Sequence, residues 1–174
     1  MKRIFFIAIL FSLGLMFTSC EALFEWNQPE EPTVEYSAVW PLSGEWWVQY
    51  SLEDGTNLSG GYMALHTYNT AAEDVNKLWV SDAAAHFWIY TAKVDCDVPS
   101  RTFSGSVKSS AIDDGAAYDI NITITDGKVL EDGGFSTSGV VCDSIYFKIE
   151  FEDDPGTKYV VAGVRRTGFL EDEH

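Results

Sequence analysis

Residues 144–152 read SIYFKIEFE, and this stretch decides the fold. From 145 to 151 the odd positions are isoleucine or phenylalanine, whereas the even positions are tyrosine, lysine and glutamate. Because successive side chains of a strand point to opposite faces, this alternation predicts a β-strand with one buried and one wet face. Residues 118–125 alternate in the same way, with isoleucines against aspartate, asparagine and threonine.

Turn-forming residues separate such stretches. We expect Asp126-Gly127 to form a tight hairpin between two strands, and the Asp-Asp-Pro-Gly at 153–156 to form another. Residues 60–61, 113–115 and 133–134 mark further turns. No window between these turns repeats apolar residues with a helical period over a helical length. The expected strands are 44–50, 60–69, 76–82, 86–97, 101–109, 117–125, 128–138, 144–152 and 157–166.

This pattern predicts an all-β domain of eight or nine antiparallel strands. Strands joined in sequence order by short turns form a meander, which loses its two unpaired edges by closing into a barrel. The interior of an eight-stranded barrel is either filled by side chains or just able to hold one small ligand. A two-sheet β-sandwich is the alternative architecture.

Length and charge limit the functions that the chain can have. Its 174 residues suit one domain with a tail. Lysines and arginines number 11 against 27 aspartates and glutamates, which gives a formal net charge of −16. This acidity argues against nucleic acid as a partner, because phosphate binding needs a basic face. It also argues against docking on anionic lipids through a polybasic patch.

The first twenty residues carry a targeting pattern. A basic start precedes an apolar run over 4–17, which is too short for a helix to span a bilayer core of about 30 Å. The Phe-Thr-Ser-Cys at 17–20 resembles the lipobox of bacterial lipoproteins, although its first two residues depart from the commonest pattern. The resemblance implies that 1–19 is a cleaved signal peptide. It also implies that Cys20 carries lipid and anchors the protein in the cell envelope, which we expect to be that of a Gram-negative bacterium, at the outer membrane. The alternative is an ordinary signal peptide with a chance cysteine.

Residues 20–41 read as an extended tether. Three prolines in this stretch, the last at Pro41, remove backbone donors and disfavour packed strands or helices. The aromatic residues of 36–40 do not suit a pure spacer, so we expect them to pack against the domain. Contact with lipid headgroups or with a partner is the alternative for these side chains. The barrel domain then spans 42–174.

Gly44-Glu45-Trp46 opens the first expected strand, and Arg165-Arg166 closes the last. This placement resembles the lipocalins, in which the tryptophan of a G-x-W motif sits at the closed end of the barrel under a basic side chain from the final strand. The resemblance implies that Trp46 closes one end and that Arg165 or Arg166 covers its ring. The chain is most similar to small lipocalin-like bacterial lipoproteins, a family labelled lipid-binding putative hydrolase. A second lipocalin motif and a C-terminal helix after the last strand are missing.

The residues offer no catalytic constellation and no metal or cofactor site. His66, His86 and His174 are the only histidines in the sequence, and none has the spacing of a metal-binding motif. The stretch around Ser136 misses the nucleophile elbow, because serine stands at 138 where the motif needs glycine and no helix follows. We therefore expect no catalytic residues, and solvated surface charge in the acidic turns.

Aromatic residues carry the ligand hypothesis. Seven of them fall on expected strands that neighbour one another, where inward-pointing rings would line a site for a hydrophobic molecule. An eight-stranded barrel also needs large side chains merely to fill itself, so a filled core is the alternative. The candidate lining residues are Tyr62, Tyr68, Trp79, Phe87, Trp88, Tyr90 and Phe103.

Cys96 and Cys142 remain once Cys20 is assigned to lipid. An oxidising compartment allows a disulfide between them, worth about 3–4 kcal/mol in the loop-entropy model. Two buried thiols that lie too far apart to bond are the alternative.

Together these features predict a membrane-anchored lipoprotein whose barrel binds a small hydrophobic ligand without catalysis. The first alternative is an acidic interaction module with a filled core that binds a protein or glycan partner. An esterase-like hydrolase ranks last. An internal cavity of at least ~300 Å³ would separate the first two functions.

Overall fold

The computed structural model describes residues 35–82 and 87–174. The expected signal peptide, Cys20 and His86 lie outside these residues. The described compact unit runs from Tyr36 to His174. Its elements are η2 (Trp40–Leu42), β1 (Gly44–Leu52), β2 (Met63–Tyr68), β3 (Lys77–Ser81), β4 (Thr91–Asp97), β5 (Thr102–Lys108), β6 (Ala111–Asp113), β7 (Ala116–Tyr118), β8 (Asn121–Phe135), β9 (Val141–Phe151), β10 (Tyr159–Arg165) and η3 (Leu170–Asp172).

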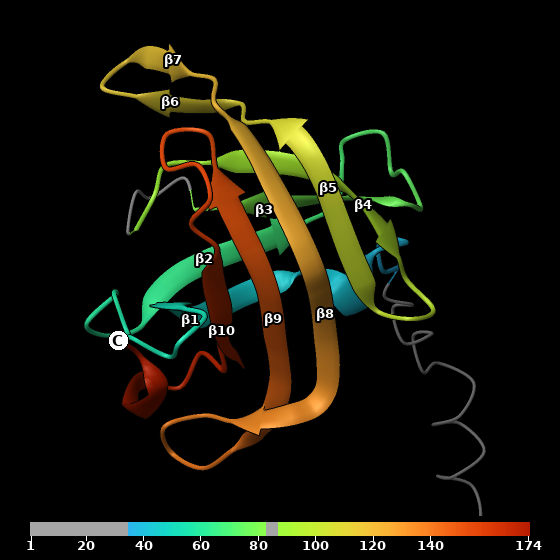
Figure 1. Ribbon diagram of the computed structural model, residues 1–174. Coiled ribbons are helices and arrows are strands. Elements are labelled where there is room, and N and C mark those ends of the chain that lie inside the picture. Colours follow the sequence, from blue (N-terminus) through green and yellow to red (C-terminus); the bar gives the residue numbers. More distant parts are fainter. Residues whose placement is uncertain (1–34, 83–86) are drawn as a thin grey trace, which may run out of the picture. The chain divides into compact units, whose positions relative to one another are not determined.

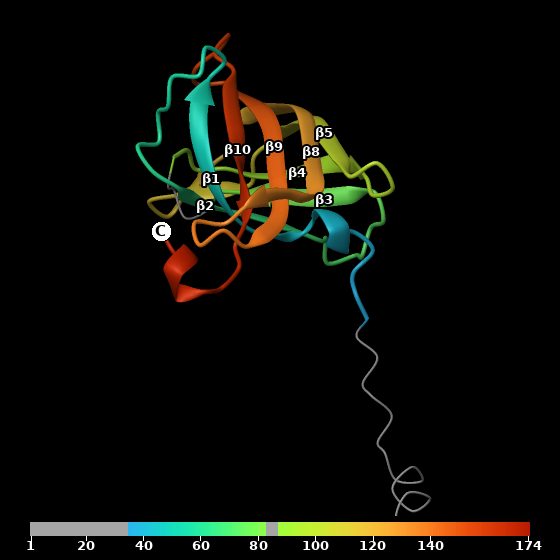
Figure 2. The same cartoon turned by 90° about the horizontal axis from the view of Figure 1, so that it is seen from below.

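Eight of the strands close into an antiparallel barrel in the order β1-β10-β9-β8-β5-β4-β3-β2 (Figure 1). Strands that follow one another in the chain pair with one another, and β1 completes the circle by pairing with β10. The register of this closing pair runs from Trp46↔Arg165 to Leu52↔Tyr159. The predicted all-β meander and its closure into a barrel are confirmed, and the sandwich alternative is wrong. Figure 2 shows the strands curving around one interior.

The strand directions define two ends of the barrel. We call the end of the barrel that holds Trp46 the closed end. There β1 and β9 begin, and β8 and β10 end. At the opposite end lie the β1–β2 and β3–β4 connections and the β9–β10 turn. We name this second end the plugged end, because Phe87 and Trp88 of the β3–β4 connection occupy it.

Two predicted turns form as expected. The Asp-Asp-Pro-Gly at 153–156 joins β9 to β10, with the Asp154 amide donating to the Phe151 carbonyl at 3.1 Å. The Asp-Asp-Gly at 113–115 joins β6 to β7, which form a separate two-stranded sheet between β5 and β8 in the chain. Figure 1 shows this small hairpin standing away from the barrel wall.

Asp126-Gly127 does not form the predicted hairpin. Both residues lie inside β8, which pairs with β9 and β5 and changes register at this point. Asp126 has a φ of 56°, and a Cβ on Gly127 would lie 2.3 Å from the carbonyl oxygen of Phe103. A left-handed residue followed by one without a side chain serves a bulge as well as a tight turn. These residues therefore bend one long strand instead of joining two.

The predicted strand 86–97 was placed too early, because β4 begins only at Thr91. The backbone before it folds across the plugged end and is held there by Asp82. The amides of Phe87 and Trp88 donate to Asp82 Oδ2 at 3.1 and 3.2 Å. The Asp82 amide in turn donates to the Tyr90 carbonyl at 3.0 Å. A carboxylate that accepts these donors keeps the connection out of the sheet.

The interior positions follow the alternation that the sequence shows. On β9 the isoleucines and phenylalanines of 145–151 are buried, while the residues between them are partly exposed. Each of the other seven barrel strands also contributes residues to the hydrophobic core, and these residues point inwards from alternate positions. Its largest fully buried side chains are Trp46, Tyr50, Tyr90, Phe147, Phe151, Leu42, Leu65, Leu78, Ile122, Ile124, Ile145 and Ile149.

Candidate functional site

Trp46 sits inside the barrel at the closed end, with 1% of its surface exposed. Its indole Nε1 donates to Thr67 Oγ1 at 2.8 Å, and that hydroxyl donates to the Leu42 carbonyl at 2.6 Å. Leu42 and Val39 are fully buried beside it, so the segment that leads into β1 belongs to the core. The ring is thus held by packing and by a short chain of hydrogen bonds.

Arg165, at the end of β10, covers the Trp46 ring. Its guanidinium carbon lies 4.6 Å from the ring centroid, a distance suited to cation–π attraction. Nη1 donates to the Ser43 carbonyl at 2.6 Å, and Nε and Nη2 lie 3.2 and 3.1 Å from Asp143 Oδ2. A Cβ on Gly44 would lie 2.6 Å from Arg165 Nη1, so a side chain at this position would displace the guanidinium.

Arg166 points elsewhere. Its guanidinium pairs with Glu45 at 2.6 Å and with Glu173 at 2.8 Å, and its Cζ lies 5.8 Å from the Trp47 ring on the outer wall. The hydrogen bonds from both carboxylates raise the pKa of this guanidinium. Of the two arginines proposed for barrel closure, the structure therefore places Arg165 on Trp46.

Phe87 and Trp88 fill the plugged end with two stacked pairs. The Phe87 ring lies 4.2 Å from that of Tyr50, with 13° between the planes. The Trp88 ring lies 4.4 Å from that of Phe151, with 8° between the planes. Trp88 Nε1 also donates to the Tyr118 hydroxyl at 3.2 Å. We call Phe87 and Trp88 the aromatic plug.

A polar cluster lies beneath the aromatic plug. The hydroxyls of Tyr50 and Tyr90 are 3.1 Å apart, and the Tyr50 hydroxyl donates to Asp82 Oδ2 at 3.3 Å. All three residues are buried. Burial raises the pKa of both tyrosines, and the negative charge of Asp82 raises it further. Both phenols therefore stay neutral and able to donate over the physiological pH range.

The seven candidate lining residues divide between the two faces of the wall. Tyr90 and Phe103 are buried in the interior, and the two plug residues pack against the core. Tyr62, Tyr68 and Trp79 do not line the interior. The Tyr68 and Trp79 rings stack on the outer face at 6.3 Å with Lys93 over Trp79, and Tyr62 lies 4.4 Å from the His174 ring.

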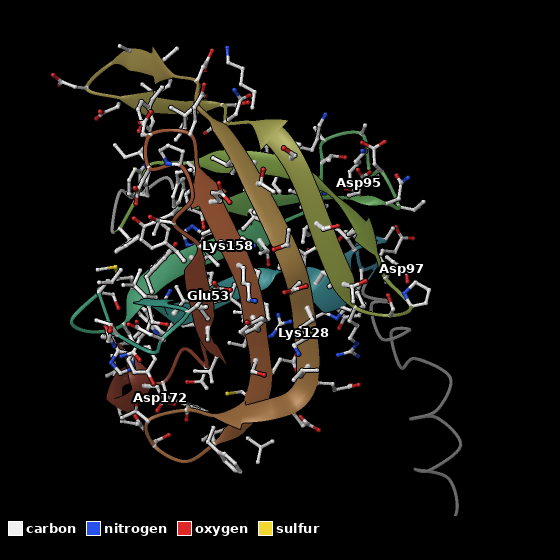
Figure 3. All side chains as sticks on the ribbon, in the orientation of Figure 1. Glu53, Asp95, Asp97, Lys128, Lys158 and Asp172 are labelled. Carbon is white, nitrogen blue, oxygen red and sulfur yellow. The ribbon has the colours of Figure 1, made fainter. Side chains whose placement is uncertain are left out.

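Two hollows in the described residues lie outside the barrel interior. One, of about 780 Å³, is an open groove over the outer face of β4, β5, β8 and β9. Asp95 and Asp97 from β4 and Lys128 from β8 line it (Figure 3), together with Tyr146, whose ring lies 5.2 Å from the Lys128 ammonium. The other, of about 550 Å³, lies at the closed end beside Trp40. Inside the barrel, the aromatic plug packs against the hydrophobic core.

The Ser136 turn, between β8 and β9, has a structural role that the sequence did not reveal. Ser136 Oγ accepts the Val140 amide at 3.1 Å and lies 3.1 Å from Ser138 Oγ. The amide and hydroxyl of Ser138 donate to Asp172 of η3, so this turn holds the C-terminal tail. Burial alone would raise the Asp172 pKa, but hydrogen bonds from Thr167 and Ser138 lower it to about 2.

His174 is the one described histidine close to this turn, and it does not reach Ser136. Its Nε2 lies 3.0 Å from Thr137 Oγ1, and its ring packs on Tyr62 and Trp47. The other described histidine, His66, lies on β2. A nucleophile with a base that is oriented by a carboxylate is therefore not assembled among these residues.

Cys96 and Cys142 are free thiols, so the disulfide considered from the sequence is not formed. They lie on β4 and β9, with β5 and β8 between these strands in the barrel. Burial and then a neighbouring aspartate, Asp95 or Asp143, raise the pKa of each thiol. A raised thiol pKa keeps the reactive thiolate scarce at neutral pH.

Within 35–82 and 87–174, no three histidine, cysteine, aspartate or glutamate side chains gather as a metal site would require. None of the helices in that part of the chain has the length and hydrophobicity to cross a membrane.

A closed eight-stranded meander, sealed at one end by a tryptophan under an arginine, is a barrel of the lipocalin-like class. The model of a family described as lipid-binding putative hydrolase matches residues 31–170. The chain therefore belongs to this family, whose label and fold together support a lipid-binding barrel. Among curated proteins, none matches the chain significantly.

Proposed function

We propose that the protein is a lipid-anchored envelope protein of a Gram-negative bacterium whose barrel binds one small hydrophobic molecule and performs no catalysis. The family match and the closed barrel support binding of a lipid. The Phe-Thr-Ser-Cys at 17–20 supports the anchor.

The observation that carries the binding proposal is the position of the aromatic plug. Phe87 and Trp88 belong to a connection, not to a barrel strand, yet their rings pack against the core. They can leave the interior without breaking a hydrogen bond between barrel strands. A hydrophobic guest then takes over the ring contacts with Tyr50 and Phe151. Apolar walls with a few polar groups at one point are typical of small-molecule sites.

The polar cluster suits the polar head of such a guest. Asp82 accepts hydrogen bonds and the neutral hydroxyls of Tyr50 and Tyr90 can donate or accept. The rest of the interior is hydrocarbon and aromatic surface. An amphiphile with an apolar body and a small hydroxyl or carboxylic acid head matches this distribution.

The proposal that the protein performs no catalysis is supported by the hydrogen bonds of the serine and threonine hydroxyls near the β8–β9 turn. Ser136 and Ser138 serve the β8–β9 turn, and Thr167 binds Asp172. The carboxylate that accepts from Ser138 and Thr167 belongs to Asp172, whose pKa is lowered to about 2, so it is a weak base for a hydroxyl proton.

The binding proposal is tested on native protein extracted from membranes. Mass spectrometry should find a co-purifying lipid, and a fluorescent fatty acid should bind at one site per chain. Phe87→Ala and Trp88→Ala should each tighten probe binding several-fold, because less of the plug must be displaced. Trp79→Ala, on the outer face, is the matched control and should leave binding unchanged. Native protein without lipid or probe binding, together with plug variants that bind no better, would refute the proposal.

The anchor is tested separately. Cys20→Ala should move the protein from the membrane fraction to the soluble fraction, because acyl chains on one residue supply most of the membrane affinity. Retention of the Cys20→Ala protein in the membrane pellet after a high-salt wash would contradict lipidation as the anchor.

The groove on the outer face favours a second candidate function, an acidic interaction module. Two carboxylates at the end of β4 and the lysine–tyrosine pair of β8 and β9 offer hydrogen bonds and a ring face to a glycan or a protein loop. Tyr146→Ala should then abolish partner binding on a glycan array or in pull-downs, and should leave the fatty-acid probe unaffected. The reverse result would exclude this function.

A further inference from the structure

Exposed apolar side chains gather at the closed end of the barrel. Of the large hydrophobic residues that are exposed in the described parts, Leu58 and Ile112 lie at the plugged end, and Leu130 and Tyr62 lie on the wall, with Tyr62 beside His174. All the others lie in the lead into β1, the tail after β10, or the closed-end parts of β2, β8 and β9 with the connections that join them to their neighbours. They are Tyr36, Trp40, Tyr68, Val75, Phe135, Val140, Val141, Phe169 and Leu170.

The most exposed of them are fixed in place by the fold. Phe135, at 68% exposure, is the last residue of β8, and Leu170, at 89%, is the first of η3; the turn that follows Phe135 is tied to η3 by Ser138 and Asp172. The Trp40 ring lies 4.6 Å from that of Tyr36, tilted by 34°, and 5.9 Å from the guanidinium of Arg165, the residue that covers Trp46. Figure 1 shows the β8–β9 turn and η3 side by side at the bottom of the barrel. Apolar groups held out into water mark an interaction surface.

The occupant of this surface follows from the chain that leads into it. Cys20 stands 15 residues before Glu35, the first described residue, and Tyr36 and Trp40 come directly after it. A chain of that length spans at most ~54 Å and, as a flexible coil, about 22 Å on average. An acyl anchor at Cys20 therefore keeps this end of the barrel, more than any other part, next to the bilayer. Tryptophan and tyrosine prefer the headgroup level of a membrane.

Charge selects the kind of lipid. The chain carries a formal charge of −16, and the arginines of this end are engaged with Asp143, Glu45 and Glu173. This surface therefore does not attract anionic headgroups. Shallow insertion of rings and aliphatic tips among zwitterionic headgroups is the contact that it fits.

We propose that the closed end of the barrel rests on the membrane, with Tyr36, Trp40, Phe135 and Leu170 among the headgroups of a zwitterionic phospholipid surface. This rests on the proposed anchor at Cys20. The plugged end then faces away from the bilayer, and the hydrophobic guest enters from the aqueous side, from a carrier or another protein and not from the membrane below.

The experiment uses the lipidated full chain on phosphatidylcholine vesicles whose acyl chains are brominated close to the headgroup. Trp26, which lies nearer to Cys20, is replaced by phenylalanine in every protein to lower the background. Quenching of tryptophan fluorescence by the bromines should fall at least twofold on Trp40→Phe. It should not fall on Trp88→Phe, the control at the plugged end.

A second comparison of variants tests the exposed apolar side chains of Phe135 and Leu170 and leaves every tryptophan in place. Phe135→Ser with Leu170→Ser should also lower the quenching at least twofold, whereas Ile112→Ser at the far hairpin should leave it unchanged. An unchanged melting temperature in these variants would show that the lower quenching does not result from a loss of folded protein. Quenching that is the same in all variants on vesicle-bound protein overturns the proposal. Failure of the lipidated chain to bind vesicles at all would instead overturn the anchor, and with it this orientation.

Discussion

The two ends of the barrel are closed by opposite means. At the closed end the seal is made by residues of the barrel strands and of the segment leading into them, with Trp46 on β1, Arg165 on β10 and Asp143 on β9. At the plugged end it is made by Phe87 and Trp88, which stack on strand residues but belong to a connection. Opening the first end requires strands to separate, while opening the second moves one loop. On the proposed function, the first end serves stability and the second serves ligand exchange.

Trp46→Ala should cause the largest loss of stability among the variants that test this difference between the two ends. Removing a fully buried indole leaves a cavity and deprives Thr67 of its hydrogen-bond partner, which should cost about 3–5 kcal/mol of unfolding free energy. Urea or thermal unfolding measures the loss. Trp79→Ala, on the outer face under Lys93, should cost about 1 kcal/mol or less. Similar losses for the two variants would show that the closed end has no special part in stability.

Arg165→Met tests the cover of the tryptophan. It removes the cation over the ring and leaves Asp143 and the Ser43 carbonyl without this donor, so we expect a loss of about 1–3 kcal/mol. Arg166→Met removes ion pairs that are more exposed to solvent, so its effect on the free energy of unfolding should be clearly smaller. If Arg166→Met proves the more damaging in chemical unfolding, the roles assigned to the two arginines are wrong.

Phe87→Ala measures the other end. The ring is only partly buried and its support is a connection, so the expected loss is about 1–2 kcal/mol, smaller than for Trp46→Ala. Hydrogen exchange should speed up between residues 87 and 91 and stay unchanged in β1 and β10. Faster exchange throughout the barrel would mean that the aromatic plug is as structural as the closed end.

Alkaline pH should weaken the polar cluster at the plugged end. The folded state holds the pKa of Tyr50 and Tyr90 above the unfolded value near 10. Their contribution to stability is therefore complete below pH 10 and is lost as the pH rises towards the folded values. Tyr50→Phe should make the decline of unfolding free energy between pH 10 and 11.5 shallower, with little change at pH 7. An unaltered slope would place the phenols outside a buried cluster.

Alternation of side chains predicted the barrel well because its interior is apolar almost everywhere. The period of two at 145–151 holds in the structure, and the pairing of Trp46 with an arginine of the last strand was expected from the resemblance to the lipocalins. These features are local or lie at the two chain ends of the domain, so the sequence displays them.

The errors arose where one local pattern serves two structures. Asp126-Gly127 supplies a left-handed backbone that suits a hairpin and a bulge equally, and only pairing with both neighbours of β8 selects the bulge. Phe87 and Trp88 looked like strand residues because they are aromatic. Their amides donate to the Asp82 carboxylate, which comes several residues earlier in the chain. The alternation of apolar and polar residues does not reveal such a contact. Tyr68 and Trp79 were expected inside because large rings on strands usually are, yet they stack on the outer face.

The pairing of β1 with β10 has a consequence for how the molecule is made. Trp46 and Arg165 are about 120 residues apart, so the contact that completes the circle is among the least local in the chain. Until the last strand arrives, β1 and β9 each present an unpaired edge to other chains. A chain that ends before Tyr159 should therefore aggregate and not fold into a looser barrel. Export in an unfolded form would leave the nascent protein dependent on chaperones for the seconds that such a closure takes.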